Sequence, residues 1–131
     1  LVRSKMLHIA NKTRKRTPKI PFTEIKDSAL GQGYELSLVF VGDKLSRSAN
    51  SKYRGQDKAT NILSFPYSKT EGEVLINLNI VTKEAKDSAQ KPDNYLVYLF
   101  IHGLIHLKGF DHGSRMEKEE QKIREKFIRF F

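Results

Sequence analysis

The chain has 131 residues, 38% of them hydrophobic, no cysteine, and a mean hydropathy of -0.54. This length predicts one domain that buries about two-thirds of its unfolded surface, and the composition fits a soluble globular protein. No apolar run reaches the ~18 residues of a membrane span, and the lack of cysteine excludes disulfides and thiolate zinc sites. We therefore expect a single domain, residues 1–131, in which any metal is bound by His, Asp or Glu.

The chain is strongly basic. Its 24 Lys and Arg against 15 Asp and Glu give a formal net charge of +9 and a pI near 9.8, which is typical of nucleic-acid-binding domains. Charge alone does not separate RNA, DNA, a ribosome, an anionic membrane or no such partner at all. Residues 1–5 lack the apolar segment of a signal peptide, so we expect a cytoplasmic protein.

In the first part of the chain, the apolar pattern predicts strands with helices between them. Residues 6–11 form a short strand in which His8 alternates with apolar neighbours and is most simply structural. Residues 21–30 form a weak helix that two glycines stop, and residues 34–41 form a strand that enters the sheet interior. Basic residues that could bind phosphate or simply face solvent follow the first strand: Lys12, Arg14, Lys15, Arg16 and Lys19.

In the middle of the chain, Asp43 is expected to cap a short helix, and residues 46–60 are expected to form a polar loop. Residues 62–65 form a short strand that Pro66 ends. Residues 74–80 alternate apolar side chains with asparagines and are the fourth predicted strand.

Helices are predicted for the last third of the chain. Residues 82–90 form a short helix capped by Thr82, and Pro92 stands in the first turn of the next helix. From Tyr95 that helix is apolar on nearly every face, which predicts burial. Residues 114–117 match a capping box and begin a last helix with one apolar stripe. Together these elements predict an α+β (mixed α/β) domain with one roughly four-stranded mixed sheet and helices packed on it.

Three of the four histidines fall in residues 102–112. His102 and His106 are four residues apart, so on a helix they share one face, about one turn apart. Gly109 can end that helix in left-handed geometry and let the chain return His112 toward the same point. Three imidazoles without a fourth protein ligand describe a zinc site with an open coordination position, as in catalytic zinc sites. We predict these three histidines as metal ligands.

The apolar surroundings of these histidines favour metal binding. A buried imidazole without a partner costs about 1–3 kcal/mol, and a divalent cation compensates both side chains at once. The alternative is a pair of histidines hydrogen-bonded in the core. Gly103 costs roughly 1 kcal/mol against alanine in mid-helix, which suggests that backbone or substrate comes close there.

The histidine spacing matches the zincin motif H-E-x-x-H-x-x-G-x-x-H, except that Gly103 replaces the glutamate. In a peptidase that glutamate activates the metal-bound water, so its absence argues against peptide hydrolysis. Asp111 is the nearest carboxylate in the motif. It could orient a ligand histidine, transfer a proton, or only stabilise the turn.

Two separated blocks carry a specific resemblance. Residues 102–112 read H-G-L-I-H-L-K-G-F-D-H, and residues 53–66 read Y-R-G-Q-D-K-A-T-N-I-L-S-F-P. They resemble the blocks H-G-x-L-H-L-x-G-Y-D-H and Y-R-x-x-D-x-P-T-D-V-L-S-F-P of the YbeY family, the bacterial endoribonucleases of ribosomal RNA maturation. The resemblance covers about Ser37 to the end. The departures fall at no predicted metal ligand. Ala59 replaces Pro, Asn61 replaces Asp and Phe110 replaces Tyr; outside the two blocks, Glu73 replaces the Asp of a Gly-Asp-Ile strand start.

The resemblance implies a zincin-like fold with the metal site on the penultimate helix. It implies His102, His106 and His112 as ligands of one Zn²⁺, with Ni²⁺ or another divalent metal as a substitute in vitro. It implies Arg54 as the functional arginine, because a guanidinium matches the charge that phosphodiester cleavage builds on phosphate oxygens.

The same resemblance implies a zinc-dependent endoribonuclease for single-stranded RNA, acting in ribosomal RNA processing and ribosome quality control. The expected partners are ribosomal RNA and the ribosome or its small subunit, without a membrane or a small-molecule cofactor. Two alternatives remain: a zincin-type metallopeptidase, and a non-catalytic, metal-stabilised ribosome-assembly or RNA-binding factor. The residues do not decide whether metal-bound water or the RNA 2′-hydroxyl is the nucleophile.

Overall fold

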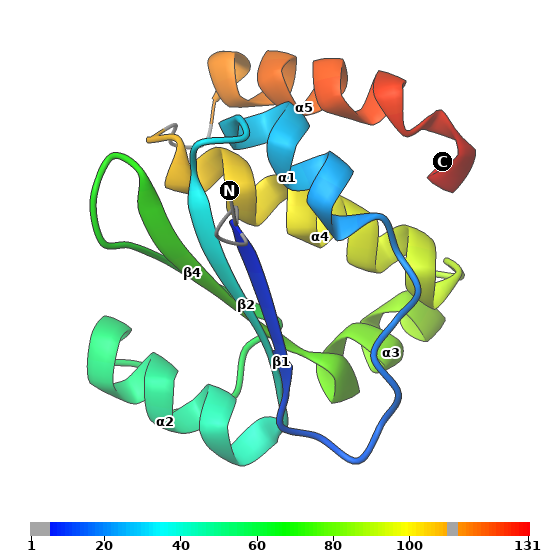
Figure 1. Cartoon of the computed structure of the whole chain (residues 1–131). Coiled ribbons are helices and arrows are strands. Elements are labelled where there is room, and N and C mark those ends of the chain that lie inside the picture. The colour runs from blue at the N-terminus through cyan, green and yellow to red at the C-terminus, as the bar shows by residue number, and fades with distance from the viewer. Residues whose placement is uncertain (1–5, 110–112) are drawn as a thin grey trace.

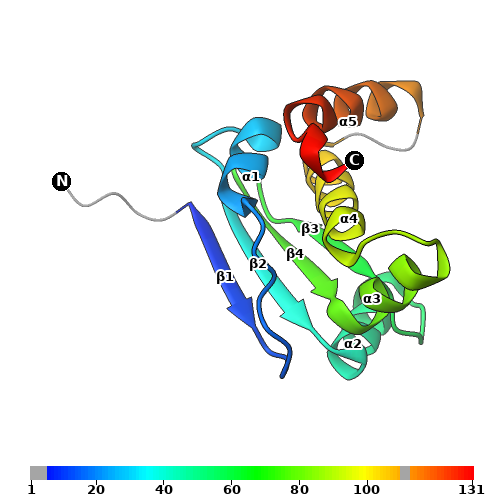
Figure 2. The ribbon, with the colours of Figure 1, turned by 90° about the vertical axis from the view of Figure 1, so that its right-hand side faces the viewer.

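A computed structural model of the chain describes residues 6–109 and 113–131. Its strands form one four-stranded mixed sheet in the order β1-β2-β4-β3. Figure 1 labels β1, β2 and β4, and Figure 2 shows β3 beside β4 as well. The strands β1, β2 and β4 are parallel, and β3 pairs antiparallel with β4, so β3 is an edge strand. The predicted α+β architecture with a four-stranded mixed sheet is therefore confirmed. The strands are β1 (Leu7–Asn11), β2 (Glu35–Val41), β3 (Ile62–Pro66) and β4 (Glu71–Asn77).

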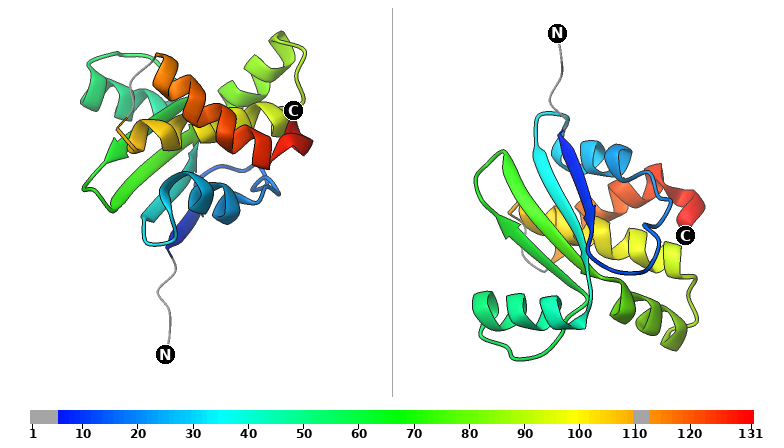
Figure 3. Two further views of the ribbon diagram at one scale, coloured as in Figure 1. Left: turned by 90° about the horizontal axis from the view of Figure 1, so that it is seen from above. Right: turned by 60° about the horizontal axis from the view of Figure 1, so that its bottom comes forward.

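Five α-helices and a short 3₁₀ helix complete the described part of the chain. Helices α1 and α5 lie at the top of the view in Figure 1, with α4 beneath them, whereas α2 lies at the opposite end of the sheet; Figure 3 gives two further views. Among the described residues, no helix is long and apolar enough to cross a membrane. The helices are α1 (Phe22–Leu30), α2 (Asp43–Arg54), α3 (Leu78–Asp87), α4 (Pro92–Leu107), α5 (Ser114–Lys126) and η1 (Ile128–Phe130).

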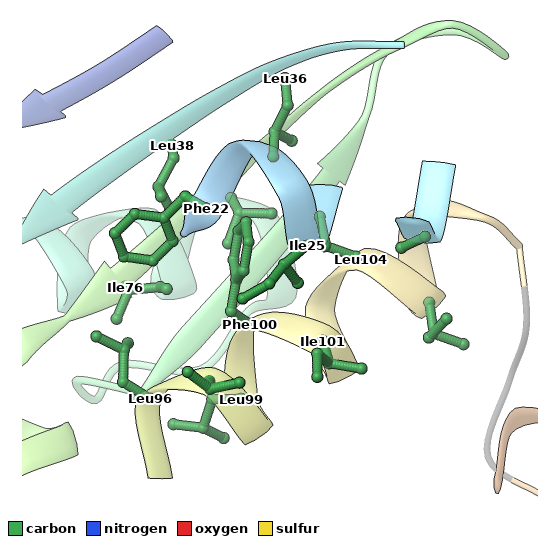
Figure 4. Packing of buried hydrophobic residues seen from close by; sticks show 14 of the residues in the cluster. Phe22, Ile25, Leu36, Leu38, Ile76, Leu96, Leu99, Phe100, Ile101 and Leu104 are labelled. Atoms are coloured by element: carbon green, nitrogen blue, oxygen red, sulfur yellow. The ribbon is translucent and has the colours of Figure 1, made fainter. Parts of the chain in front are cut away.

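The core lies between the sheet and helices α1, α4 and α5. Every second residue of β2 is buried, as the alternation of a strand with one core face requires. In Figure 4, Phe22 and Ile25 of α1 lie close to Phe100 of α4. The rings of Phe22 and Phe100 meet edge to face, with centroids 5.2 Å apart. Nine of the sixteen residues of α4 are buried, which confirms the predicted central helix.

Helix α2 is much longer than predicted, because most of its residues fall in the segment 46–60 that we expected to be a loop. Its inward face is polar: Ser46 and Asn50 are buried. The Ser46 hydroxyl donates to the Thr60 carbonyl at 2.7 Å, and the Asn50 amide donates to the Lys58 carbonyl at 2.9 Å. Hydrogen bonds to the following loop therefore replace the apolar contacts that a hydrophobic pattern would have revealed.

The fourth strand begins and ends three residues earlier than predicted, at Glu71 and Asn77, and the next helix begins earlier as well. Strand β4 ends at Asn77, and α3 begins at Leu78 rather than at Thr82. The Asn77 side-chain oxygen accepts from the backbone N–H groups of Asn79 and Ile80 at 3.0 and 3.2 Å. Asn77 is therefore the N-cap, and the alternation that predicted a strand through residue 80 is the first turn of a helix.

Two further capping predictions are wrong. Asp43 is the first residue of α2, not its cap, and its carboxylate accepts a hydrogen bond from the Asn77 side chain at 2.9 Å. Ser114 is the first residue of α5, whose N-cap is Gly113, without a side-chain capping bond. The expected apolar stripe of this helix is present, since Met116 and Ile123 are buried.

Candidate active site

Helix α4 brings two of the predicted histidines together. The Nε2 atoms of His102 and His106 lie 3.1 Å apart, and both side chains are partly buried. The four-residue spacing therefore produces the shared face that the sequence predicted. Helix α4 ends at Leu107, one residue after His106, and Gly109 has a φ of +97°, the left-handed geometry expected at this stop.

Helix α5 adds a residue that the sequence analysis missed. The Glu120 Oε1 atom lies 2.5 Å from His102 Nδ1, and the two side chains are 14% and 21% exposed. A carboxylate accepts hydrogen bonds, so the Nδ1–H group of His102 donates and its Nε2 lone pair faces His106. Glu120 is eighteen residues from His102, and only the packing of α5 on α4 joins them.

The histidine pair opens into a cleft of about 820 Å³. The cleft runs between α4 and the edge strand β3, and the last residues of α2 complete its wall. Arg54 is the final residue of α2 and lines the same cleft, although it is remote from the histidines in the sequence. The extension of α2 beyond its predicted end therefore determines where Arg54 is placed.

Gly103 lies where α4 packs closely against β3. A Cβ atom there would lie 2.7 Å from Ile62 Cδ1 and 3.0 Å from Ser64 Oγ. The Ser64 hydroxyl also donates to the Gly103 carbonyl at 3.1 Å. The side chains of Ile62 and Ser64 thus explain why a glycine stands at position 103. A glutamate at this position, as in the zincin peptidase motif, would require the Ile62 side chain to move.

A carboxylate network joins α3 to the cleft. Glu84 Oε1 accepts hydrogen bonds from the Asn61 amide and the Tyr95 hydroxyl, each at 2.9 Å. Burial, followed by this bond to Glu84, raises the pKa of Tyr95 to about 12, so its phenol stays protonated near neutral pH. An aspartate at position 61 would place a second carboxylate beside Glu84, whereas the amide of Asn61 donates to it.

The remaining predicted site residues are placed as follows. His112 and Asp111 lie outside the described residues, and the assignment of all three histidines as metal ligands stays a prediction. Within residues 6–109 and 113–131, no group of three His, Cys, Asp or Glu side chains could hold a metal ion. His8 lies on β1 with an exposed side chain, 3.9 Å from Glu35.

Fold and cleft together define a small α+β protein with a histidine-lined cleft along a sheet edge. Comparison with known families is consistent with this class: the family model described as "Endoribonuclease YbeY" matches residues 3–129. The chain belongs to the YbeY endoribonuclease family. The resemblance predicted from two motif blocks is thereby confirmed.

Several curated proteins named Endoribonuclease YbeY are similar to this chain. The protein of Neorickettsia sennetsu is 36% identical over 107 residues, which cover 73% of this chain and 75% of the relative. The protein of Allorhizobium ampelinum is 39% identical over 97 residues, covering 67% and 58%. That of Agrobacterium fabrum is 34% identical over 128 residues, covering 91% and 72%. The matches therefore span 58% to 75% of the length of these relatives.

A solved structure has the same fold. The solution structure of TM1509 from Thermotoga maritima superposes with a TM-score of 0.64, covering 93% of this chain and 91% of that protein. The two sequences are 19% identical, so the likeness concerns the fold.

Proposed function

We propose that the protein is a metal-dependent endoribonuclease that cleaves single-stranded RNA, with ribosomal RNA on the small ribosomal subunit as its substrate. The observation that carries this proposal is the meeting of the His102–His106 pair with Arg54 in one cleft. The net charge of +9 suits a polyanionic substrate, and the relatives named above are called endoribonucleases. An unpaired strand fits because it can enter a cleft and present one phosphate.

The histidine pair fits a zinc ion. Two nitrogen ligands at about 2.0–2.1 Å from one tetrahedral zinc are roughly 3.3 Å apart, close to the 3.1 Å between these Nε2 atoms. His112 is the proposed third ligand. When bound, the metal supplies a Lewis acid for the scissile phosphate and an acidic water. Three imidazoles also suit Ni²⁺ and other divalent ions, so metal analysis belongs with the assay.

Arg54 is proposed to stabilise the charge that develops on the phosphate. Its guanidinium presents a planar fork of N–H donors that matches two phosphate oxygens. A peptidase would instead need a carboxylate in the cleft, and position 103, which carries it in the zincin motif, is a glycine packed against Ile62 and Ser64. The cation therefore favours phosphodiester over amide hydrolysis.

Glu120 is proposed as a positioning residue for His102. By accepting the Nδ1–H bond it holds the ring in the tautomer whose Nε2 atom can bind a metal. We expect Glu120→Gln to weaken zinc binding by about 10- to 100-fold, because an outer carboxylate of this kind contributes that much to affinity. Competition with a chromogenic chelator measures the affinity without reference to catalysis.

A matched control for this variant is Glu125→Gln, which removes an exposed carboxylate from the same helix. It should bind zinc as the wild type does. Both variants should unfold at similar temperatures without metal, which separates positioning of the ligand from a general loss of stability. Equal zinc affinities for Glu120→Gln and wild type would refute the positioning role.

The proposed activity is tested by metal removal. A labelled single-stranded ribosomal RNA fragment should be cleaved by the zinc-loaded protein, spared after treatment with a chelator, and cleaved again after zinc is restored. Cleavage that persists with chelator would indicate a contaminating nuclease. A metal-free protein that loses its fold while the loaded protein binds RNA without cutting it would instead support the assembly-factor alternative.

A further inference from the structure

A second, larger groove lies along α2 beside the histidine cleft. It measures about 1040 Å³ and is formed by α2, the loop that follows it and the first turns of α3. We call it the α2–α3 groove. Its wall carries two acidic residues, Asp43 and Asp57, and an excess of basic ones: Lys44, Arg47, Lys52, Lys58 and Lys83.

Both carboxylates of the groove already have partners. Asp57 accepts two bonds from Arg47, at 2.7 and 3.0 Å, and Asp43 accepts one from the side chain of Asn77. The exposed groove lysines, by contrast, form no ion pair within the described part of the chain: Lys44, Lys52, Lys58 and Lys83. Their charges face a concave surface, where charges of one sign reinforce each other's field.

The α2–α3 groove and the histidine cleft are lined by adjoining residues of the same two segments. On α2, Lys52 lines the groove and the next residue, Tyr53, lines the cleft. In the following loop, the change from groove to cleft occurs between Ala59 and Thr60. The same two segments therefore form adjoining walls of both hollows.

An exposed aromatic ring stands at this junction. Tyr53 is 61% exposed, and its ring lies 4.8 Å from that of Phe65 and 5.5 Å from the Lys52 ammonium group. Proteins that bind single strands without sequence preference combine such aromatic platforms, on which bases stack, with basic grooves that follow the backbone. Both parts are present here.

We propose that the α2–α3 groove binds the phosphate backbone of the RNA strand as it leaves the histidine cleft. The strand passes over Tyr53, on which one base stacks, and its phosphates meet Lys44, Lys58 and Lys83. This inference rests on the proposed function and adds to it the path of the substrate. It makes the protein prefer RNA long enough to occupy both hollows.

The test compares two triple variants with the same loss of charge. One carries Lys44→Gln, Lys58→Gln and Lys83→Gln in the groove. The other carries Lys118→Gln, Lys122→Gln and Lys126→Gln, all on the exposed face of α5. Each is made in zinc-loaded Arg54→Ala protein, so that the probe is not shortened during the measurement. Fluorescence anisotropy then reports the binding of labelled single-stranded RNAs of about 4 and about 16 nucleotides.

We expect the groove variant to bind the longer RNA at least about tenfold more weakly, and the plot of log affinity against log salt to lose about 2 units of slope. Each lost phosphate contact removes about 0.7 units for a single strand. The α5 variant should keep a slope close to that of the parent. In the otherwise wild-type enzyme, the groove variant should raise KM for the longer RNA and leave kcat unchanged.

Equal losses in the two triple variants would show an effect of net charge and overturn the inference. An unchanged slope in the groove variant would also overturn the inference. This is the result expected if the groove binds a protein instead of RNA. If the Arg54→Ala parent binds RNA but the wild-type protein does not cleave it, the proposed nuclease activity is refuted. The groove inference is then still tested, because the comparison of slopes does not depend on cleavage. Failure of the parent to bind RNA would overturn both.

Discussion

Replacing His106 with alanine is expected to abolish stoichiometric zinc binding and to lower RNA cleavage by roughly 100- to 1000-fold. His106 supplies one of the two Nε2 atoms that meet 3.1 Å apart on α4. Its loss removes one of the three proposed histidine ligands. Metal catalysis of this kind contributes several kcal/mol, at about 1.36 kcal/mol for each tenfold in rate. Elemental analysis gives the metal content, and single-turnover cleavage of labelled RNA gives the rate.

The matched control is His8→Ala, which removes an exposed imidazole from β1. It should retain both zinc and activity. The same experiment extends to His112→Ala, which should behave as His106→Ala does if it is the third ligand. Wild-type zinc content and cleavage in His106→Ala would refute the metal site.

Replacing Arg54 with alanine is expected to lower kcat by roughly 100- to 1000-fold while zinc content stays at the wild-type value. The guanidinium is proposed to act on charge that grows only in the transition state, and the loss of one such donor costs about that factor. Arg54→Lys should recover part of the rate, because an ammonium supplies the charge but not the planar fork.

The arginine control is Arg129→Ala, at an exposed position in η1. It should cleave as the wild type does. A change in KM alone for Arg54→Ala would assign this residue to uniform substrate binding. Loss of zinc from the same variant would assign it to the structure of the site instead. Either result would contradict the proposed role.

Two central elements could be predicted because their burial follows the hydrophobic pattern. Strand β2 and helix α4 lie in the core, so their apolar residues reveal them. Helix α2 could not be predicted in the same way, since Ser46 and Asn50 occupy its buried face and depend on the carbonyls of a loop that follows. After Asn77, the alternation of apolar residues predicted a strand through residue 80. The Asn77 side chain instead caps a helix that begins at Leu78.

The candidate site likewise has features that the local sequence determines and features that depend on tertiary packing. The sequence alone determined the His102–His106 pair, because the spacing of two residues on one helix is a local property, and it carried the motif blocks that indicate the family. Only the tertiary structure decided that Glu120 meets His102, that Arg54 shares their cleft, and that side chains of β3 pack closely against Gly103. Those relations join segments far apart in the chain, and the packing of α2, α4, α5 and β3 creates them.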